Sequence, residues 1–537
     1  MERKTIIAVG LSLLVLFGFN IMFPRKAARI PIKRTDVSEA QQAGEAAKDR
    51  EKPERSGQEA SREKLPPEKT TNLWTEKYTL TFSDVSGGLK ALALREFLQD
   101  EKEEVLFSAT DPENQLFAIR SEAYPEISEK AYSLTKENET LTYTMSIPGE
   151  IEIIKQYTID NSSDYIALEV FVKNLAKREK PFSYQMTGPS GIEKSGQIAG
   201  RSFLEADVMI DGKIWKTRDE KGKKEKTGTD IAWAAMKNRY FAVMLKPVDP
   251  VQAAIVRNIG EKNLGIVLKS RTLQLKPGEQ KSNKYLLYAG PLDEKRAESV
   301  VAGMGRVVDY GFFGGVSKVL LSVLRFFHKG VKNWGVAIIL LTLLVNVILF
   351  PLTYKSFSSM QQMKKIQPHI QKLKEVHGNN SQRLNKEMME LYKKYNVNPL
   401  GGCLPMLLQM PIFIALYQGL IRSVELKGAG FLWIKDLAKP DAVALPFSLP
   451  LIGNHINILP LLMVGAMFFQ QKISQGVAGA AVSDDQAKQQ KTMMLLMPLL
   501  FGFLFYKMPS GLVLYWLTNT ILMLGEQRFI SKRINAE

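Results

Sequence analysis

The hydrophobic residues of this 537-residue chain divide it into three regions. One continuous apolar run lies near the start, at residues 6–23. Residues 71–305 instead carry short segments in which apolar and polar positions alternate. From residue 306 onward, long apolar runs are separated by basic segments. Together these patterns predict an integral membrane protein with about six spanning helices and one large extracytoplasmic β domain.

The first apolar run has 18 residues and is interrupted only by Ser12 and Asn20. A cleaved signal peptide normally has a shorter apolar region, so we favour a retained transmembrane anchor at residues 1–24. Residues 25–70 follow, and between positions 33 and 64 Val37 is the one aliphatic residue larger than alanine. Such a segment cannot bury enough apolar surface to fold, which predicts a flexible linker.

Short segments rich in β-branched and aromatic residues predict strands in residues 71–305. The clearest are KYTLTF (77–82), LTYTMSI (141–147), IEIIKQYTI (151–159), YIALEVFV (165–172) and YFAVMLKP (240–247). Turn signals such as SGG, PGE and KPGE separate several of them. Many strands with few helical stretches predict a large all-β antiparallel sandwich.

Residues 306–332 have the pattern of an amphipathic helix. Apolar residues recur at helical spacing along one side of this helix: Val316, Val319, Leu320, Val323, Leu324 and Phe327. The opposite side is mainly basic and carries Lys318, Ser322, Arg325 and Lys329. This pattern favours a helix in the membrane interface, marked by Lys318, Arg325 and Phe327. Packing against the β domain is the alternative.

Five further apolar runs predict spans at about 334–354, 400–421, 452–472, 493–507 and 510–526. The last three have clean apolar stretches of about 14 residues, below the roughly 20 that cross a hydrocarbon core. Three short runs in succession predict a helical bundle in a locally thinned bilayer.

The polar segment 355–398 contains nine Lys or Arg against three Glu. Two apolar rows at helical spacing, separated by HGNN (377–380), predict an antiparallel helical hairpin whose first helix Pro368 kinks or restarts. Its candidate contact residues are Lys364, Lys365, Lys372, Lys374, Arg383 and Lys386. A short loop this basic lies in the cytoplasm, which places both termini there and the β domain outside. Basic residues after the first span oppose this orientation, but long domains translocate largely regardless of charge.

Composition narrows the class of function. The net charge of +17 suits nucleic acid or an anionic membrane surface, and the apolar runs favour the membrane, so we expect no specific nucleic-acid target. The single cysteine, Cys403, excludes an intrachain disulfide. The four histidines are scattered, and the sequence has no Walker loop, dinucleotide fingerprint or nucleophile elbow. We therefore expect no catalytic residue, metal or cofactor.

Polar side chains are rare in the predicted spans: Thr342, Asn346, Gln409, Tyr515, Trp516 and Asn519. An amide stranded in hydrocarbon is costly, so these groups should face the protein interior or water. They either bond neighbouring helices or line a shared polar groove. No charged residue lies centrally in a predicted span, which argues against an ion-coupled transporter.

Three motifs resemble the core of the YidC/Oxa/Alb membrane-protein insertases. They are NWGVAIILLTLLVNVILFPLT (333–353), NPLGGCLPMLLQMPIFIALYQGL (398–420) and PSGLVLYWLTN (509–519). The basic hairpin and the order of the motifs also match, and the anchor and β domain resemble the Gram-negative bacterial YidC layout. The resemblance implies a multi-pass protein of the bacterial inner membrane, with a periplasmic β domain, that inserts and chaperones membrane proteins. Its implied partners are nascent membrane proteins, the Sec translocon, the ribosome and membrane lipid.

The resemblance also implies a mechanism. Five core helices would enclose a hydrophilic groove that is open to the cytoplasm and to lipid, lined by the polar residues named above. Many family members carry an arginine at the position of Asn346. A neutral amide there predicts a weaker preference for acidic substrate tails.

The sequence leaves two other classes of protein possible. A solute transporter or channel with an extracytoplasmic binding domain needs a pathway open alternately to both sides. A carbohydrate enzyme or lectin on a membrane tether would use the sandwich for binding, but the sequence offers no defensible acid–base pair of carboxylates.

Overall fold

The computed structural model describes residues 67–99, 102–128, 130–192, 203–218, 224–228, 230–260, 263–300, 302–377, 380–395, 397, 404–449, 453–478 and 496–536. The anchor predicted at residues 1–24 and nearly all of the linker predicted at 25–70 lie outside this range.

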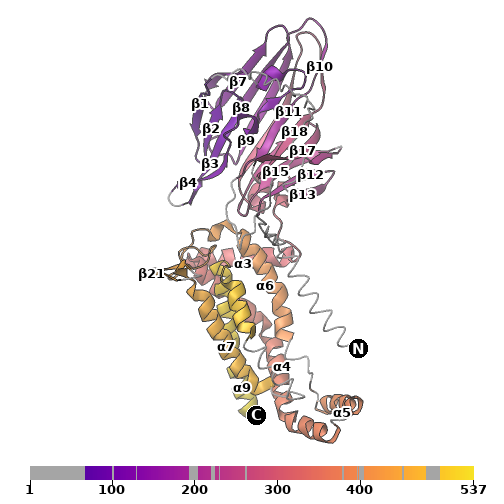
Figure 1. Ribbon diagram of the computed structural model, residues 1–537, viewed down its shortest axis with the longest axis vertical. Coiled ribbons are helices and arrows are strands. Elements are labelled where there is room, and N and C mark those ends of the chain that lie inside the picture. The colour runs from indigo at the N-terminus through magenta and orange to yellow at the C-terminus, as the bar shows by residue number, and fades with distance from the viewer. Residues whose placement is uncertain are drawn as a thin grey trace, which may run out of the picture. The chain divides into compact units, whose positions relative to one another are not determined.

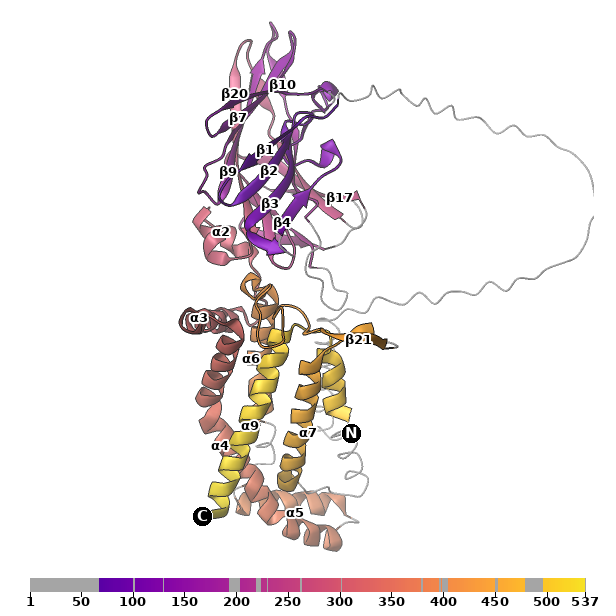
Figure 2. The ribbon, with the colours of Figure 1, turned by 90° about the vertical axis from the view of Figure 1, so that its left-hand side faces the viewer.

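The first half of the described chain is an antiparallel β sandwich (Figures 1 and 2), as the alternating pattern predicted. The nine-stranded sheet has the order β13 (Lys213–Thr217), β12 (Glu205–Ile210), β15 (Ile231–Lys237), β16 (Phe241–Pro247), β20 (Gln280–Pro291), β9 (Tyr165–Asn174), β8 (Ile151–Thr158), β7 (Thr140–Ile147) and β6 (Ser133–Glu137). The five-stranded sheet has the order β14 (Lys224–Thr227), β17 (Val251–Gly260), β18 (Asn263–Ser270), β11 (Gln185–Ser190) and β5 (Ile119–Arg120). Strands β15 and β16 pack on β11, and β15 also packs on β17 and β18, so these two sheets enclose part of the core.

Smaller elements complete this region. A four-stranded sheet contains β1 (Thr70–Trp74), β2 (Tyr78–Ser83), β3 (Gly88–Gln99) and β4 (Lys102–Ser108), and β10 (Lys180–Phe182) pairs with β19 (Leu273–Leu275). Two 3-10 turns, η1 (Pro112–Asn114) and η2 (Pro125–Ser128), lie between strands. All five segments singled out in the sequence form strands. On β8, alternate residues face the core, so that Ile151, Ile153 and Tyr157 are buried, whereas β16 is buried on both faces.

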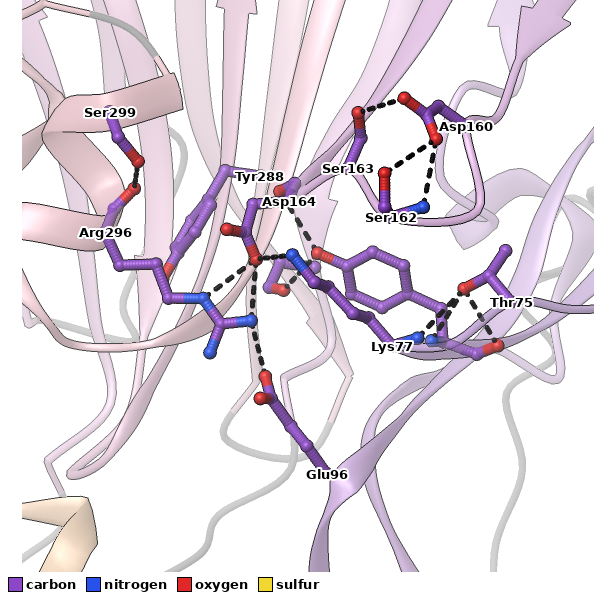
Figure 3. A network of polar contacts seen from close by, with 12 residues as sticks. Thr75, Lys77, Glu96, Asp160, Ser162, Ser163, Asp164, Tyr288, Arg296 and Ser299 are labelled. Atoms are coloured by element: carbon purple, nitrogen blue, oxygen red, sulfur yellow. Dashed lines mark hydrogen bonds and ion pairs between the residues drawn. The ribbon is translucent and has the colours of Figure 1, made fainter.

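A short helix, α2 (Glu294–Val300), follows the last strand of the sandwich and is fixed to it by Arg296. The Arg296 guanidinium donates to Oδ1 of Asp164 at 2.8 and 2.6 Å and pairs with Glu96 at 2.5 Å (Figure 3). Lys77 pairs with the same Asp164 oxygen at 2.9 Å (Figure 3). These contacts join α2 to strand β3 and to the loop between β8 and β9.

The second half of the described chain is mainly helical. Its elements are η3 (Met304–Val307), α3 (Gly314–Val331), α4 (Trp334–His377), α5 (Ser381–Lys394), α6 (Leu404–Arg422), η5 (Val424–Leu426), the hairpin β21 (Val443–Leu449) and β22 (Gly453–Ile456), α7 (Ile458–Ala478), the helix Leu496–Phe505 and α9 (Ser510–Ala536). Helices α4, α6, α7 and α9 run alongside one another (Figures 1 and 2). Within the described part of the chain, one helical stretch, Trp334–Met363, is long and apolar enough to cross a membrane, and Ile458–Ile473 and Leu496–Phe505 are shorter apolar helices.

The structure divides the helical region differently from the sequence in two places. The predicted second span and the first helix of the hairpin are one helix, α4, which continues through Pro351 and Pro368. Proline removes one helical hydrogen bond, but the flanking turns hold the helix together. Residues 453–456, at the start of the predicted fourth span, instead form β22, and the helix begins at Ile458.

The buried face of helix α3 is rotated relative to the predicted stripe, because it includes Leu321 and leaves out Val316 and Val319. Leu320, Leu321 and Leu324 are buried against α4 and α6, whereas Val316 and Val319 are 42% and 63% exposed. Lys318 pairs with Glu294 at 2.7 Å, and Arg325 pairs with Asp293 and with Glu425. The exposed apolar residues are compatible with the membrane interface, which stays a prediction.

Candidate functional site

Three of the polar residues predicted for the spans, Thr342, Asn346 and Asn519, come together between α4 and α9. The Asn346 side-chain amide donates to the Oδ1 of Asn519 at 2.9 Å and to the backbone oxygen of Thr342 at 2.8 Å. Thr342 donates to the backbone oxygen of Ile338, one turn earlier in the same helix. Thr342, Asn346 and Asn519 are at most 7% exposed. Their arrangement follows from the four-residue spacing, which stacks Thr342 and Asn346 on the face of α4 that packs against α9.

A second polar contact joins α6 to α9. The Gln409 side-chain amide donates to the Tyr515 hydroxyl at 2.5 Å, and Tyr515 is fully buried. The neighbouring Trp516 is half-buried and packs its ring against Phe413, Phe501 and Phe505, with centroid distances of 4.8 to 5.5 Å. The structure therefore places Tyr515 in a polar pair and Trp516 in an aromatic cluster.

The space among these groups is small. A cavity of about 10 Å³ is lined by Asn346, Gln409 and Thr353 together with the apolar residues Leu349, Leu352, Leu408 and Met523. This volume holds about one water molecule. The sequence left open whether these side chains bond neighbouring helices or line a shared polar groove. The structure joins Asn346 with Asn519 and Gln409 with Tyr515 beside one small cavity, and a groove open to the cytoplasm stays a prediction.

Some polar residues of this region escaped the sequence analysis. Thr353 lies seven residues, or two turns, after Asn346 and lines the same cavity. Gln361 and Gln527 are buried, and Gln361 donates to Ser531 at 2.7 Å, so the polar contacts between α4 and α9 continue beyond the apolar part of α4. The seven-residue spacing after Asn346 was the signal in the sequence that could have found Thr353.

The basic hairpin is built from the end of α4 and from α5. Ile366, Ile370 and Val397 form its buried cluster, with Met363, Met388, Leu391 and Tyr392 packed around it. Lys365, Lys372, Arg383 and Lys386 are exposed, as expected for contact residues. The positions of Lys364 and Lys374 belong to α4, but their side chains lie outside the described residues.

One more pocket lies between the two helices of the hairpin. It has a volume of about 420 Å³ and is lined by both apolar and polar residues, which are His369, Lys372, Leu373, Val376, His377, Glu387, Glu390, Leu391 and Lys394. In this pocket the Nε2 of His377 lies 3.2 Å from a carboxylate oxygen of Glu387. Among the described residues, no group of three or more His, Cys, Asp or Glu side chains is placed to hold a metal ion.

Charged groups also gather where the sandwich meets the helical region. Lys237 pairs with Asp207 at 2.5 Å, and both side chains are buried. Burial raises the pKa of Asp207 to about 6, although the Lys237 ammonium opposes that shift. A cavity of about 40 Å³ lies beside this pair, lined in part by Glu205, Lys237 and Arg422. Two salt bridges therefore lie at this junction, Lys237 with Asp207 and Arg218 with Glu205.

Comparisons with known proteins match both halves of the chain. Residues 70–323 match the family described as YidC periplasmic domain, and residues 326–537 match the family described as 60Kd inner membrane protein. A protein of Pelobacter propionicus named Membrane protein insertase YidC is 33% identical, and the match covers 100% of each chain. A protein of the same name from Geobacter metallireducens is 32% identical, over 100% of this chain and 99% of that one.

Among solved structures, a galactose mutarotase-like protein from Lactobacillus casei matches 41% of this chain and 100% of its own length, at 11% identity and a TM-score of 0.33. A likeness at this level carries no argument about what the β domain does.

Proposed function

This chain belongs to the YidC family of membrane protein insertases, and we propose that it inserts integral membrane proteins along the polar face that α4, α6 and α9 share. The observation that carries the proposal is the pair of inter-helix contacts, Asn346 with Asn519 and Gln409 with Tyr515. Each contact offers a polar flank of a client protein hydrogen-bonding partners at positions where the surrounding side chains are apolar.

The physical benefit is a lower desolvation cost. A short polar tail that crosses a bilayer loses its hydrogen bonds to water, and each unpaired group is costly in hydrocarbon. Amide and hydroxyl groups on the shared face replace some of these bonds while the apolar part of the client moves into lipid. Outward-facing residues of α4, such as Val347 and Ile348, are 61% and 66% exposed and suit contact with lipid or with the client. No covalent step is required.

The proposal includes a topology and partners. In this proposal, the protein has six spans with five core helices, both termini in the cytoplasm and the β domain in the periplasm. The shared face opens to the cytoplasm. Exposed lysines and arginines of the hairpin contact the ribosome and the emerging client, and the protein works alone or with the Sec translocon. The alternation of a basic hairpin with apolar helices supports this orientation.

Thiol labelling tests both the function and the orientation. In a Cys403→Ser background, single cysteines at positions 342, 346 and 516 are exposed to an impermeant maleimide from either side of sealed membrane vesicles. We expect labelling from the cytoplasmic side alone, fastest at the half-buried position 516 and slow at positions 342 and 346, which are at most 7% exposed, with competition by a client during its insertion. Labelling that alternates between the two sides would favour a transporter and refute the proposal.

A second experiment identifies the clients. Depletion of the protein, followed by profiling of the inner membrane, should show a set of membrane proteins that fail to insert. If the membrane composition stays unchanged after depletion, the proposed function is wrong.

A further inference from the structure

Arg239 lies in the turn between β15 and β16, and its side chain reaches out of the sandwich into the helical region. Its Nε–H donates to the backbone oxygen of Ile421 at 2.5 Å, and an Nη–H donates to the backbone oxygen of Ala438 at 3.1 Å. The residue is 2% exposed. Asn238 fixes the turn itself, because its side-chain oxygen accepts from the amides of Tyr240 and Phe241 at 2.9 Å.

The partners of Arg239 explain how a buried cation is tolerated there. Ile421 belongs to the last turn of α6, where carbonyl groups lack helical donors and the helix dipole is negative. The guanidinium also stacks on the ring of Tyr240 at 4.5 Å. Burial lowers the pKa of Arg239, but a guanidinium starts far enough above neutral pH to stay charged. Its planar fork lets one side chain bond two separate segments.

The second segment that Arg239 contacts also holds the start of α9. The Ser510 amide and hydroxyl both donate to the backbone oxygen of Lys439 at 2.8 Å, and the Gly511 amide donates to that of Leu437 at 2.9 Å. The Ser510 hydroxyl also contacts the backbone oxygen of Asp436 at 3.1 Å. Residues 436–439 therefore connect Arg239 directly to the first turn of α9.

Resting on the proposed function, we propose that Arg239 is a positioning residue that sets the outer end of α6 against that of α9. Those two helices carry Gln409 and Tyr515, whose hydrogen bond requires the helices to keep their separation and rotation. The β domain thus takes part in insertion through one side chain that touches neither the client nor the polar face.

Another contact at the same junction supplies a matched control. Lys427 pairs with Glu104 of β4 at 2.5 Å, and both side chains are largely buried. This ion pair also joins the sandwich to the helical region, and the Lys427 ammonium lies over the rings of Phe241 and Tyr240 at 5.4 and 6.0 Å. Its hydrogen bond goes to Glu104, whereas the backbone oxygens of Ile421 and Ala438 accept from Arg239. Replacing both members with glutamine removes the ion pair without leaving one charge unpaired, which is the costly case.

The test uses the full-length protein in proteoliposomes, in a Cys403→Ser background with Leu512→Cys as a reporter in the first turn of α9. Leu512 is 1% exposed, so a maleimide reaches this thiol slowly unless the end of α9 moves. Insertion of a single-span protein with a short polar amino-terminal tail is measured in parallel. Limited proteolysis of the β domain confirms that each variant folds.

Arg239→Ala should raise the labelling rate about tenfold and slow insertion about fivefold, because both carbonyl contacts are lost. The labelling rate and the insertion rate of Arg239→Lys should lie between those of the wild type and Arg239→Ala, because an ammonium can bond one of the two carbonyls. The Glu104→Gln/Lys427→Gln variant should change each rate by less than about twofold.

The proposal would be overturned if the Arg239→Ala variant inserted clients at the wild-type rate. It would also be overturned if the control variant showed equal effects, because general docking of the domains would then be what matters. The two proposals fail separately. If the wild type inserts no client while Arg239→Ala still exposes the reporter, the proposed function is wrong and the positioning of α9 stands.

Discussion

Asn346 on α4 donates its side-chain amide to the Oδ1 of Asn519 on α9 across 2.9 Å. The two residues are 173 positions apart in the chain, and both are buried. This contact puts a neutral hydrogen-bonding group where the resemblance to other insertases implies an arginine. The structure therefore supplies directional hydrogen bonds at this point without a net charge.

An Asn346→Arg variant should insert clients with acidic tails faster relative to clients with neutral tails. A guanidinium in a low-dielectric site attracts carboxylates, and even a strongly screened interaction of about 1 kcal/mol gives roughly fivefold in rate. The measurement is a ratio of insertion rates for matched clients whose tails differ only in Asp or Asn content. Asn346→Gln is the neutral control, and an unchanged ratio in the arginine variant would contradict the prediction.

Tyr515→Phe should destabilise the helical region by about 1 kcal/mol, because the Gln409 amide loses its buried acceptor. Gln409→Leu should cost a similar amount. The double variant should cost less than the sum of the two single changes, since both remove the same hydrogen bond. Thermal unfolding in detergent measures the three changes, and strict additivity would show that the contact is absent in the membrane-extracted protein.

We expect acidic pH to lower the stability of the segment just before α3, because Asp309 lies in it. Burial disfavours its ionised form, but hydrogen bonds from the Lys216 ammonium and the Gly311 amide outweigh this and lower its pKa to about 2, from an ordinary value of 3.8. A carboxyl with a depressed folded-state pKa stabilises the protein above pH 3.8, and that contribution disappears as the pH falls towards 2.

Asp309→Asn removes the titrating group, so its stability should change less with pH between about 4 and 2 than that of the wild type. Unfolding midpoints measured across this range provide the comparison. Parallel curves for the two proteins would show that Asp309 is not responsible for the acid sensitivity.

Ile370→Ala should open the hairpin locally. Ile370 is 1% exposed and packs with Ile366 and Val397, and truncation of a buried isoleucine costs about 2–5 kcal/mol. Trypsin should then cut faster at the exposed residues Arg383 and Lys386. Val376→Ala, at a position 72% exposed on the same helix, is the control and should leave the cleavage rate unchanged. Equal rates in all three proteins would mean that this cluster does not hold the hairpin together.

The sandwich was predictable from the sequence because its signal is local. Alternation within seven to ten residues is enough to identify β7, β8 and β9, whichever strands they pair with. Sheet order is different: β16 pairs with β20, some forty residues later, and nothing in either segment specifies that partner. The many strand segments predict that two sheets pack together, but they do not predict the order of the strands within each sheet.

The candidate site was predictable as a set of residues but not as a set of contacts. A polar residue in an apolar run signals an inward-facing group, which identified Asn346, Gln409, Tyr515 and Asn519. The pairs they form depend on the rotation of each helix, which tertiary packing decides. Arg239 had no signal at all, since an arginine in a loop between strands resembles any solvated residue until the helical region is seen to cover it.

The mutual pairing of Asn346 with Asn519 and of Gln409 with Tyr515 has a consequence for turnover. Under the proposed function, a polar face whose donors and acceptors already bond one another gains little free energy from binding a client. An arriving segment exchanges one set of bonds for an equivalent set, so its stay is brief and the original pairs re-form as it leaves. Brief binding of this kind suits the proposed insertion, in which each client must leave the polar face before the next one binds.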